Sequence, residues 1–363
     1  MIKSELEKNE NKKVNLTEDI TIYTGSNGKK GCLGNCIGCS QEVYGNQHPM
    51  YQGNLKQIET ILERSPVLKS AIILGNPDPA VDTEFCNQVA KKLTEKGIKV
   101  RFSSSGKNSS KMIKKLINGV DPNYIEHISF SIDTVEQEML NYIKGTHIDL
   151  EELRKTISYL NEKEIKVKIQ PTIWNINEDT CIDTIEYFEK QGVKWFSFHA
   201  GSFEALGDVQ KEKLKHVEPM KWRKEFSKIV NKCNESNLKL HIPYLFVNKE
   251  EMKEYISKRG AKCVPAQLKN TQVWLEKNYI RTTHCPLLNE VQNFHYNYMD
   301  MDKSNVDYSC SEIGVCPATT KALGEELCRK STDGKGHFFT YNGEQYITVC
   351  RTYNYMNYKK RNS

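Results

Sequence analysis

The sequence lacks any long hydrophobic run. No stretch of about 18 consecutive apolar residues occurs in the 363-residue chain, so no transmembrane helix and no membrane partner are predicted. The first residues, MIKSELEKNENKKVNLTED, contain no apolar segment of the kind that a secretory signal requires. We therefore expect a cytoplasmic protein, in a compartment where thiols stay reduced.

A strong charge of either sign is also missing. The formal net charge is only +6, and the basic residues are scattered along the chain instead of gathered in one patch. Solvated helix faces explain this pattern, so charge does not predict a nucleic-acid partner. Hydrophobic residues make up 38% of the chain and charged residues 27%, which is typical of a folded globular protein.

Strand and helix patterns alternate from residue 19 to about residue 247. Short apolar runs such as SAIILG are typical of parallel strands buried on both faces, and longer periodic stretches are typical of helices. Six or seven βα units in series favour a doubly wound sheet or a barrel, complete or partial. The predicted strands are 19–24, 70–75, 98–106, 127–133, 165–173, 193–200 and 238–247, and the predicted helices are 54–64, 82–96, 108–118, 149–163, 178–191 and 218–236.

The pattern changes after about residue 250. Two strand–turn–strand patterns, 273–285 and 338–350, carry Asn278 and Gly343 at equivalent turn positions, and both residue types suit a tight hairpin. Each pattern ends in a cysteine that lies 22 positions after another cysteine. We therefore divide the chain into a polar segment (1–18), a βα domain (19–247) and a cysteine-rich domain with β-hairpins (248–363).

Three of the twelve cysteines crowd into KKGCLGNCIGCSQ, at Cys32, Cys36 and Cys39. Twelve is more than packing requires in a reducing compartment, so metal binding is the better explanation. A closed zinc site needs a fourth ligand, for which His48 is the nearest candidate. Iron–sulfur cubanes are normally held by four cysteines, so three would leave one iron open to a substrate or cofactor.

The C-x3-C-x2-C spacing after the first strand of a repeated βα fold resembles the radical S-adenosylmethionine (radical SAM) superfamily. The resemblance implies a partial (β/α)6 TIM-like barrel in which Cys32, Cys36 and Cys39 hold a 4Fe–4S cluster. It implies that SAM binds the open iron and is cleaved by one electron to methionine and a 5′-deoxyadenosyl radical, which abstracts hydrogen from a substrate. A flavodoxin or ferredoxin is the implied electron donor.

The same resemblance implies contacts to SAM at the ends of successive strands. GNPDP stands where the family has the turn that meets the methionine amino group, and SID stands where it meets the ribose. The residue before the third cysteine is usually aromatic in the family, but here it is Gly38, so Tyr44 is the candidate for that place. The candidate SAM contacts are Gly75, Asn76, Ser103, Ser131, Asp133, Gln170 and Tyr44.

The cysteines after the barrel are similar to those of the SPASM and twitch extensions of radical SAM enzymes, which carry one or two auxiliary 4Fe–4S clusters. The family's tight C-x2-C-x5-C-x3-C run is absent here, and a zinc ribbon is the alternative. The candidate ligands are Cys263, Cys285, Cys310, Cys316, Cys328 and Cys350. The three remaining cysteines, Cys86, Cys181 and Cys233, lie in helical patterns and are expected to be core residues.

By analogy, we expect a radical SAM enzyme that modifies a peptide or protein side chain. Oxidation of a small molecule is the alternative within the same class. A non-catalytic zinc or iron–sulfur protein that binds nucleic acid is the alternative outside it. His199 is equally compatible with an interior position and with a substrate contact.

Overall fold

The structure is a computed structural model. It describes residues 18–25, 36–39, 53–74, 78–79, 81–201, 208–215, 217–242, 245–246, 270–275, 280–283, 296–297, 338–341 and 344–348. Among these residues, no helix is both long enough and apolar enough to cross a membrane.

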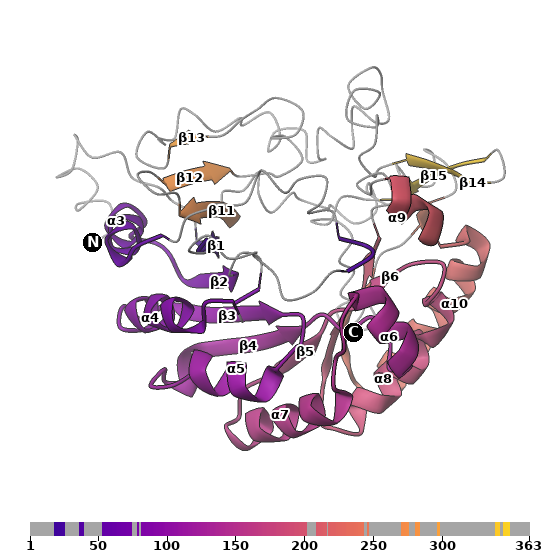
Figure 1. Cartoon of the computed structure of the whole chain (residues 1–363), viewed down its shortest axis with the longest axis horizontal. Helices are drawn as coiled ribbons and strands as arrows, with labels where there is room; N and C mark the ends of the chain where they lie inside the picture. The colour runs from indigo at the N-terminus through magenta and orange to yellow at the C-terminus, as the bar shows by residue number, and fades with distance from the viewer. Residues whose placement is uncertain are drawn as a thin grey trace.

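An open parallel sheet forms the centre of the fold. Its strands lie side by side in chain order, with helices between them on one face (Figure 1). The strands are β1 (Asp19–Tyr23), β2 (Ser70–Leu74), β3 (Lys99–Ser104), β4 (Ile125–Phe130), β5 (Val167–Ile169), β7 (Trp195–Ser197) and β9 (Lys239–His241). The predicted partial barrel is confirmed, because the sheet does not close between β9 and β1.

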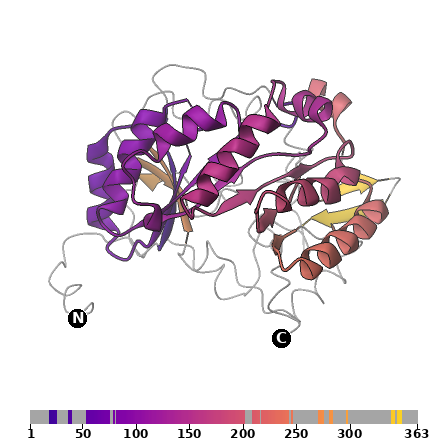
Figure 2. The same cartoon turned by 90° about the horizontal axis from the view of Figure 1, so that it is seen from below.

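Six helices pack on the outer face of the sheet, where they form a continuous layer (Figure 2). They are α3 (Leu55–Arg64), α4 (Thr83–Thr94), α5 (Ser109–Leu116), α7 (Leu150–Glu162), α8 (Cys181–Glu189) and α10 (Pro219–Glu235). Each lies within a few residues of its predicted range. Asn54, Asp82 and Asp149 stand just before three of them and accept hydrogen bonds from the first-turn amides, which explains where these helices begin.

The two faces of the sheet have different chemistry. Phe102, Phe130, Ile169 and Phe196 alternate along their strands with polar residues and are buried in the core between the sheet and the helices. Side chains at the intervening positions point to the opposite, concave face, because successive residues of a strand alternate between faces. The concave face is therefore the polar interior of the partial barrel.

Three predicted strands are each broken into two. The range 165–173 becomes β5 and β6 (Thr172–Ile173), because Pro171 between them has no N–H to donate to the ladder. The range 193–200 becomes β7 and β8 (His199–Ala200), and β8 pairs with β6 in a separate two-stranded sheet. The range 238–247 becomes β9 and β10 (Leu245–Phe246).

Two helices were not predicted: α6 (Gln137–Lys144) and α9 (Asp208–Lys213). Both are short, and both contact the cysteine loop described below. The predicted strand 127–133 is displaced toward the amino terminus, since β4 already ends at Phe130. Ser131 and Asp133 therefore lie beyond the strand.

The two hairpins predicted after residue 250 are confirmed. β11 (Asn270–Leu275) pairs antiparallel with β12 (Ile280–Thr283), and β14 (Phe338–Tyr341) pairs antiparallel with β15 (Glu344–Thr348). β13 (Tyr296–Asn297) extends the first hairpin. β11 also pairs parallel with β1, and β15 pairs with β10, so strands from both sides of residue 247 share sheets. The domain boundary at 247/248 stays a prediction.

Candidate functional site

The second and third cysteines of the predicted cluster motif lie on one tight turn. The amide of Cys39 donates to the carbonyl of Cys36 at 3.0 Å, and both residues are half-buried. The Ile37 amide donates to the carbonyl of Ile143 in α6 at 2.9 Å, and Gln210 of α9 donates to the carbonyl of Cys39 at 3.1 Å. The two unpredicted helices thus hold the turn at the carboxyl ends of the parallel strands.

Gly38, between these cysteines, lies against the ring of Trp174. A Cβ at Gly38 would come within 2.7 Å of the ring, so the glycine is required by this close approach. Gly201 lies equally close to the same ring. Trp174 is 2% exposed and packs with Leu214 and Ile37. Gly38 therefore leaves room for the ring of Trp174, which directly follows β6 and is far from Gly38 in the sequence.

A buried ion pair lies beside the turn. Lys144 Nζ is 2.8 Å from Asp133 Oδ2, and the two side chains are 5% and 3% exposed. Lys144 also donates to Ser131 Oγ at 3.0 Å. The other carboxylate oxygen of Asp133 accepts the Thr172 amide at 2.7 Å. These bonds offset the cost of burying two charges.

Asp133 is connected to the cysteine turn through two series of contacts. Lys144 directly follows Ile143, whose carbonyl holds Ile37. Asn177 donates to the backbone carbonyl of Asp133 at 2.9 Å and accepts the Trp174 amide at 2.7 Å. Both candidate ribose contacts, Ser131 and Asp133, are thus brought together with the turn. The contact of Ser131 and Asp133 with SAM stays a prediction. The hydrogen bonds and the ion pair that the structure gives them help to position the cysteine turn.

The ends of β2 and β3 are joined by a residue that the sequence reasoning missed. Asp78 is 3% exposed and accepts the Ser105 amide at 2.9 Å, Ser105 Oγ at 2.7 Å and Ser104 Oγ at 3.4 Å. An acidic residue in a loop directly after a buried strand was the signal that pointed to it. Ser103 itself is half-buried on β3, in register with Ser129 on β4.

Gln170 and His199 meet at the ends of β5 and β7. Their side-chain nitrogens are 3.4 Å apart, and both residues are half-buried. The Gln170 amide donates to the carbonyl of Phe130 at 2.8 Å, which places Gln170 beside the end of β4. Gln170, Ser131 and Asp133 therefore gather at one end of the sheet, as the prediction requires.

The remaining predicted residues lie outside the described ranges. They are Cys32, Tyr44, Gly75, Asn76 and the six tail cysteines Cys263, Cys285, Cys310, Cys316, Cys328 and Cys350. Among the residues that the structure describes, no three His, Cys, Asp or Glu side chains converge as a metal site. The ligand sets of all the predicted clusters stay predictions.

The donor chemistry of the turn fits an iron–sulfur cluster better than that of the other described cysteines. Cys86 is fully buried, and desolvation raises the pKa of its thiol to about 12. Desolvation also raises the pKa of Cys181, and that of Cys233 to about 12. Burial therefore favours the protonated form of these thiols, whereas the thiolate is the form that ligates a metal. Their prediction as core residues is confirmed, whereas Cys36 and Cys39 sit half-buried on a turn.

A family comparison decides the identity of this part of the chain. Residues 27–188 match the model of the Radical SAM superfamily. Residues 27–188 are therefore similar to the radical SAM family. The radical SAM match covers the cysteine turn and the sheet as far as α8. No curated protein matches the sequence.

Solved structures share the fold. SuiB of Streptococcus suis bound to the precursor peptide SuiA superposes with a TM-score of 0.58 at 16% identity, over 84% of this chain and 67% of that one. SuiB bound to S-adenosylmethionine gives 0.56 at 14% identity, over 84% and 68%. anSMEcpe with bound AdoMet and the Cp18Cys peptide gives 0.53 at 12% identity, over 88% of each chain. At these identities the likeness shows the fold.

Proposed function

We propose that this radical SAM protein is an enzyme that uses SAM to abstract hydrogen from a peptide or protein side chain. The observation that carries the proposal is the Cys36–Cys39 turn, held at the carboxyl ends of the strands inside a radical SAM family match. Active sites of α/β barrels lie at this end of the strands.

Cys32, Cys36 and Cys39 would hold a 4Fe–4S cluster with one open iron. When bound, this cluster supplies the electron that cleaves SAM to methionine and a 5′-deoxyadenosyl radical. The protein's own residues bind, orient and exclude water. The Asp133–Lys144 pair positions the turn through Ile143, and the bulk of Trp174 shields the third cysteine on the Gly38 side.

SAM contacts are assigned to residues at the strand ends. Ser103, Ser131, Asp133 and Gln170 gather there, and Gly75, Asn76 and Tyr44 complete the proposed set. Trp174 already provides an aromatic ring next to Gly38, so we assign the aromatic surface beside the third cysteine to Trp174 and regard Tyr44 as the second candidate.

A peptide substrate is favoured over a small molecule because two of the solved structures with this fold contain peptides, SuiA in SuiB and Cp18Cys in anSMEcpe. The hairpins after residue 250 support a SPASM- or twitch-like extension with one or two auxiliary clusters on the six tail cysteines. A flavodoxin or ferredoxin would deliver the electron.

Iron content tests the proposal. The wild type and a Cys32→Ala/Cys36→Ala/Cys39→Ala variant are reconstituted anaerobically, and iron, sulfide and zinc per chain are measured. The variant should lose about four irons, and one or two auxiliary clusters should leave about four or eight. Cys233→Ala is the matched control, because this buried thiol should not bind metal. A wild type that takes up zinc and no iron would refute the enzyme and favour the zinc-protein alternative.

Activity is measured separately. The reduced wild type should convert SAM to 5′-deoxyadenosine, and the triple variant should not. Addition of candidate peptides or small molecules should then increase this turnover, and deuterium at the abstracted position of a labelled substrate should appear in 5′-deoxyadenosine, which distinguishes the two substrate classes. Iron binding without any 5′-deoxyadenosine formation would contradict the proposed reaction.

A further inference from the structure

A second polar site lies at the opposite, amino-terminal end of the same sheet. Lys239 is the first residue of β9, Trp195 is the first of β7, and Lys166 directly precedes β5. All three line a cavity of about 530 Å³ that also contacts Glu126 and Lys194. The cysteine turn is held at the other end of the strands, so this cavity is separate from the proposed active site.

Strand register brings one row of side chains onto the concave face here. Arg101 on β3 is in register with His127 on β4, Lys168 on β5 with Trp195 on β7, and Trp195 with Lys239 on β9. Paired residues of parallel strands share a face, so the row places Lys168 and Lys239 beside the Trp195 indole ring, with Arg101 farther along the same face. The sequence pattern alone had shown only scattered charge.

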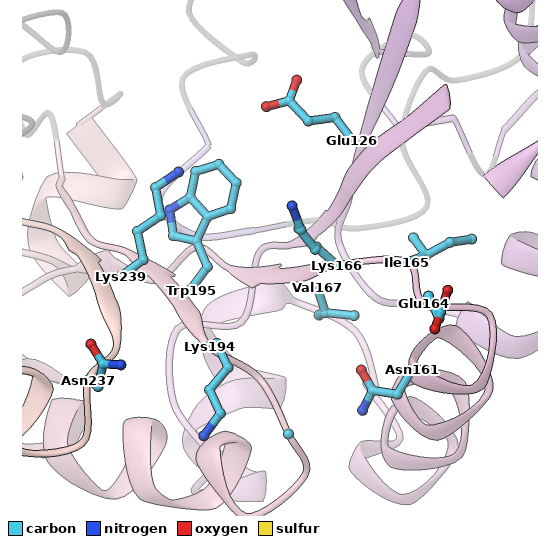
Figure 3. Close-up of a pocket in the computed structure, with 11 residues that line it drawn as sticks. Glu126, Asn161, Glu164, Ile165, Lys166, Val167, Lys194, Trp195, Asn237 and Lys239 are labelled. Atoms are coloured by element: carbon cyan, nitrogen blue, oxygen red, sulfur yellow. The ribbon is translucent and has the colours of Figure 1, made fainter. Parts of the chain in front are cut away.

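The cations of this row crowd around Trp195. Lys239 Nζ lies 3.3 Å from the centre of the ring and Lys168 Nζ lies 4.9 Å from it. Figure 3 shows the indole nitrogen of Trp195 beside the Lys239 amine, with the Lys166 amine on the same side of the strands and Lys194 on the other. Cation–π contacts of this kind stabilise the charges only partly.

Carboxylates offset the charge of this cluster only in part, although Glu126 and Glu164 also line the cavity. Arg101 is paired with Asp19 and with Glu126, whose Oε2 is 3.7 Å from Arg101 Nε. Among the described residues, none forms an ion pair with Lys166, Lys168 or Lys239. Burial, followed by repulsion from Arg101 and Lys239, lowers the pKa of Lys168 to about 7, which reflects the missing negative charge.

Two buried ring nitrogens in the same row have no hydrogen-bond partner. They are Trp195 Nε1 and Nδ1 of His127, a residue that is 3% exposed. The two rings are neighbours, with centroids 4.5 Å apart. Buried polar groups are nearly always hydrogen-bonded in native proteins, so these atoms point to an absent ligand. An indole N–H and an ammonium group only donate, so the ligand must accept.

We propose that this cavity binds an oxyanion, a carboxylate or phosphate group, between Lys166, Trp195 and Lys239, with Lys168 against the indole ring. An oxyanion supplies both the acceptor that Trp195 Nε1 requires and additional negative charge for the lysines. The site is independent of the proposed radical chemistry, because it shares no residue with the cysteine turn or the candidate SAM contacts.

Lysine acylation tests the site in the full-length protein. The chain is treated briefly with N-acetoxysuccinimide at pH 7, and acetylation of each lysine is quantified by peptide mass spectrometry. Sodium phosphate and a triglutamate peptide are the two probes, and sodium chloride at matched ionic strength is the control. A bound oxyanion should raise the pKa of Lys168 by about one unit, so its acetylation at pH 7 should fall about fivefold.

The two probes distinguish the source of the oxyanion. Protection by triglutamate at lower concentration than phosphate assigns the site to acidic side chains of a peptide, whereas protection by phosphate alone assigns it to a small phosphorylated ligand. Equal protection by sodium chloride, or protection by none of the salts, would overturn the proposal. Iron content and 5′-deoxyadenosine formation do not enter this readout, so the outcome is separate from that of the proposed function.

Variants locate the binding. Trp195→Phe keeps an aromatic ring but removes the indole N–H. The loss of one charge-assisted hydrogen bond should raise the oxyanion concentration that protects Lys168 about tenfold. Lys239→Met should abolish protection, and because it removes an unneutralised cation the variant should fold. Lys155→Met is the matched control, since Lys155 lies on the exposed surface of α7. Unchanged protection in Trp195→Phe and Lys239→Met would refute the assignment.

Discussion

The buried Asp133–Lys144 pair gives the sharpest prediction. Lys144→Met keeps most of the side-chain stem but leaves the Asp133 carboxylate, 3% exposed, with the Thr172 amide as a remaining partner at 2.7 Å. Removing one partner of a buried pair costs about 3–5 kcal/mol, because the other charge stays buried without compensation. The free energy of unfolding of Lys144→Met should therefore fall by this amount in urea, followed by far-UV circular dichroism.

A double-mutant cycle separates the ion pair from packing. Asp133→Asn alone should destabilise the protein comparably, because it leaves the Lys144 ammonium buried. Asp133→Asn/Lys144→Met contains no isolated charge and should recover about 2 kcal/mol or more relative to the sum of the single variants. Lys155→Met is the surface control, because the side chains of Lys155 and its partner Glu151 are 68% and 55% exposed, so stability should change by no more than about 0.5 kcal/mol.

The same variant tests the route to the cysteine turn. Lys144 follows Ile143, whose carbonyl accepts the Ile37 amide, so loosening α6 should lower iron retention on dilution under anaerobic conditions. The double variant should retain iron better than Lys144→Met. The reasoning is refuted if the stability of Lys144→Met is within about 1 kcal/mol of that of Lys155→Met, the limit expected for a surface pair.

Three further predictions concern Gly38, Lys168 and His127. Gly38→Ala should lower the free energy of unfolding by about 1–3 kcal/mol, because the added methyl group overpacks against the Trp174 ring. Trp174→Phe in the same chain should restore part of this loss. Thermal unfolding of the wild type, the single variant and the double variant measures both effects. Burial and neighbouring cations hold the pKa of Lys168 at about 7, below its usual 10.5. The folded chain therefore binds fewer protons than the unfolded chain between about pH 7 and pH 10.5, so the free energy of unfolding should rise with pH in this range. Lys168→Met should remove this slope and be more stable than the wild type at pH 6. Desolvation and the same cations lower the pKa of His127 to about 2, so stability should fall as the pH drops below 6.5, and His127→Phe should reduce this acid loss in urea titrations at each pH.

The sequence determined the α/β architecture because the information for it is local. Alternating apolar strands and amphipathic helices, with caps such as Asn54 and Asp149, are written in neighbouring residues. The C-x3-C-x2-C spacing is equally local, and it led to the superfamily whose model residues 27–188 match. The hairpins after residue 250 were predicted for the same reason, from turn residues between two short strands.

Only the tertiary structure decided how distant residues meet. Trp174 fills the space at Gly38, and Lys144 pairs with Asp133, because α6 and β6 return to the cysteine turn by routes that no spacing in the sequence predicts. The pairing of β6 with β8 in a separate sheet likewise depends on residues far apart in the sequence, although the break at Pro171 follows from the proline itself.

The cationic row at the other end of the sheet is the clearest case. Arg101 and Lys239 lie on strands far apart in the sequence, and each looks like one more scattered charge. Parallel register places Arg101, Lys168 and Lys239 on one face, with the two lysines against Trp195. The sequence carries the charge of each residue, but electrostatic energy depends on the distance between charges and on their burial, and both are properties of the folded chain.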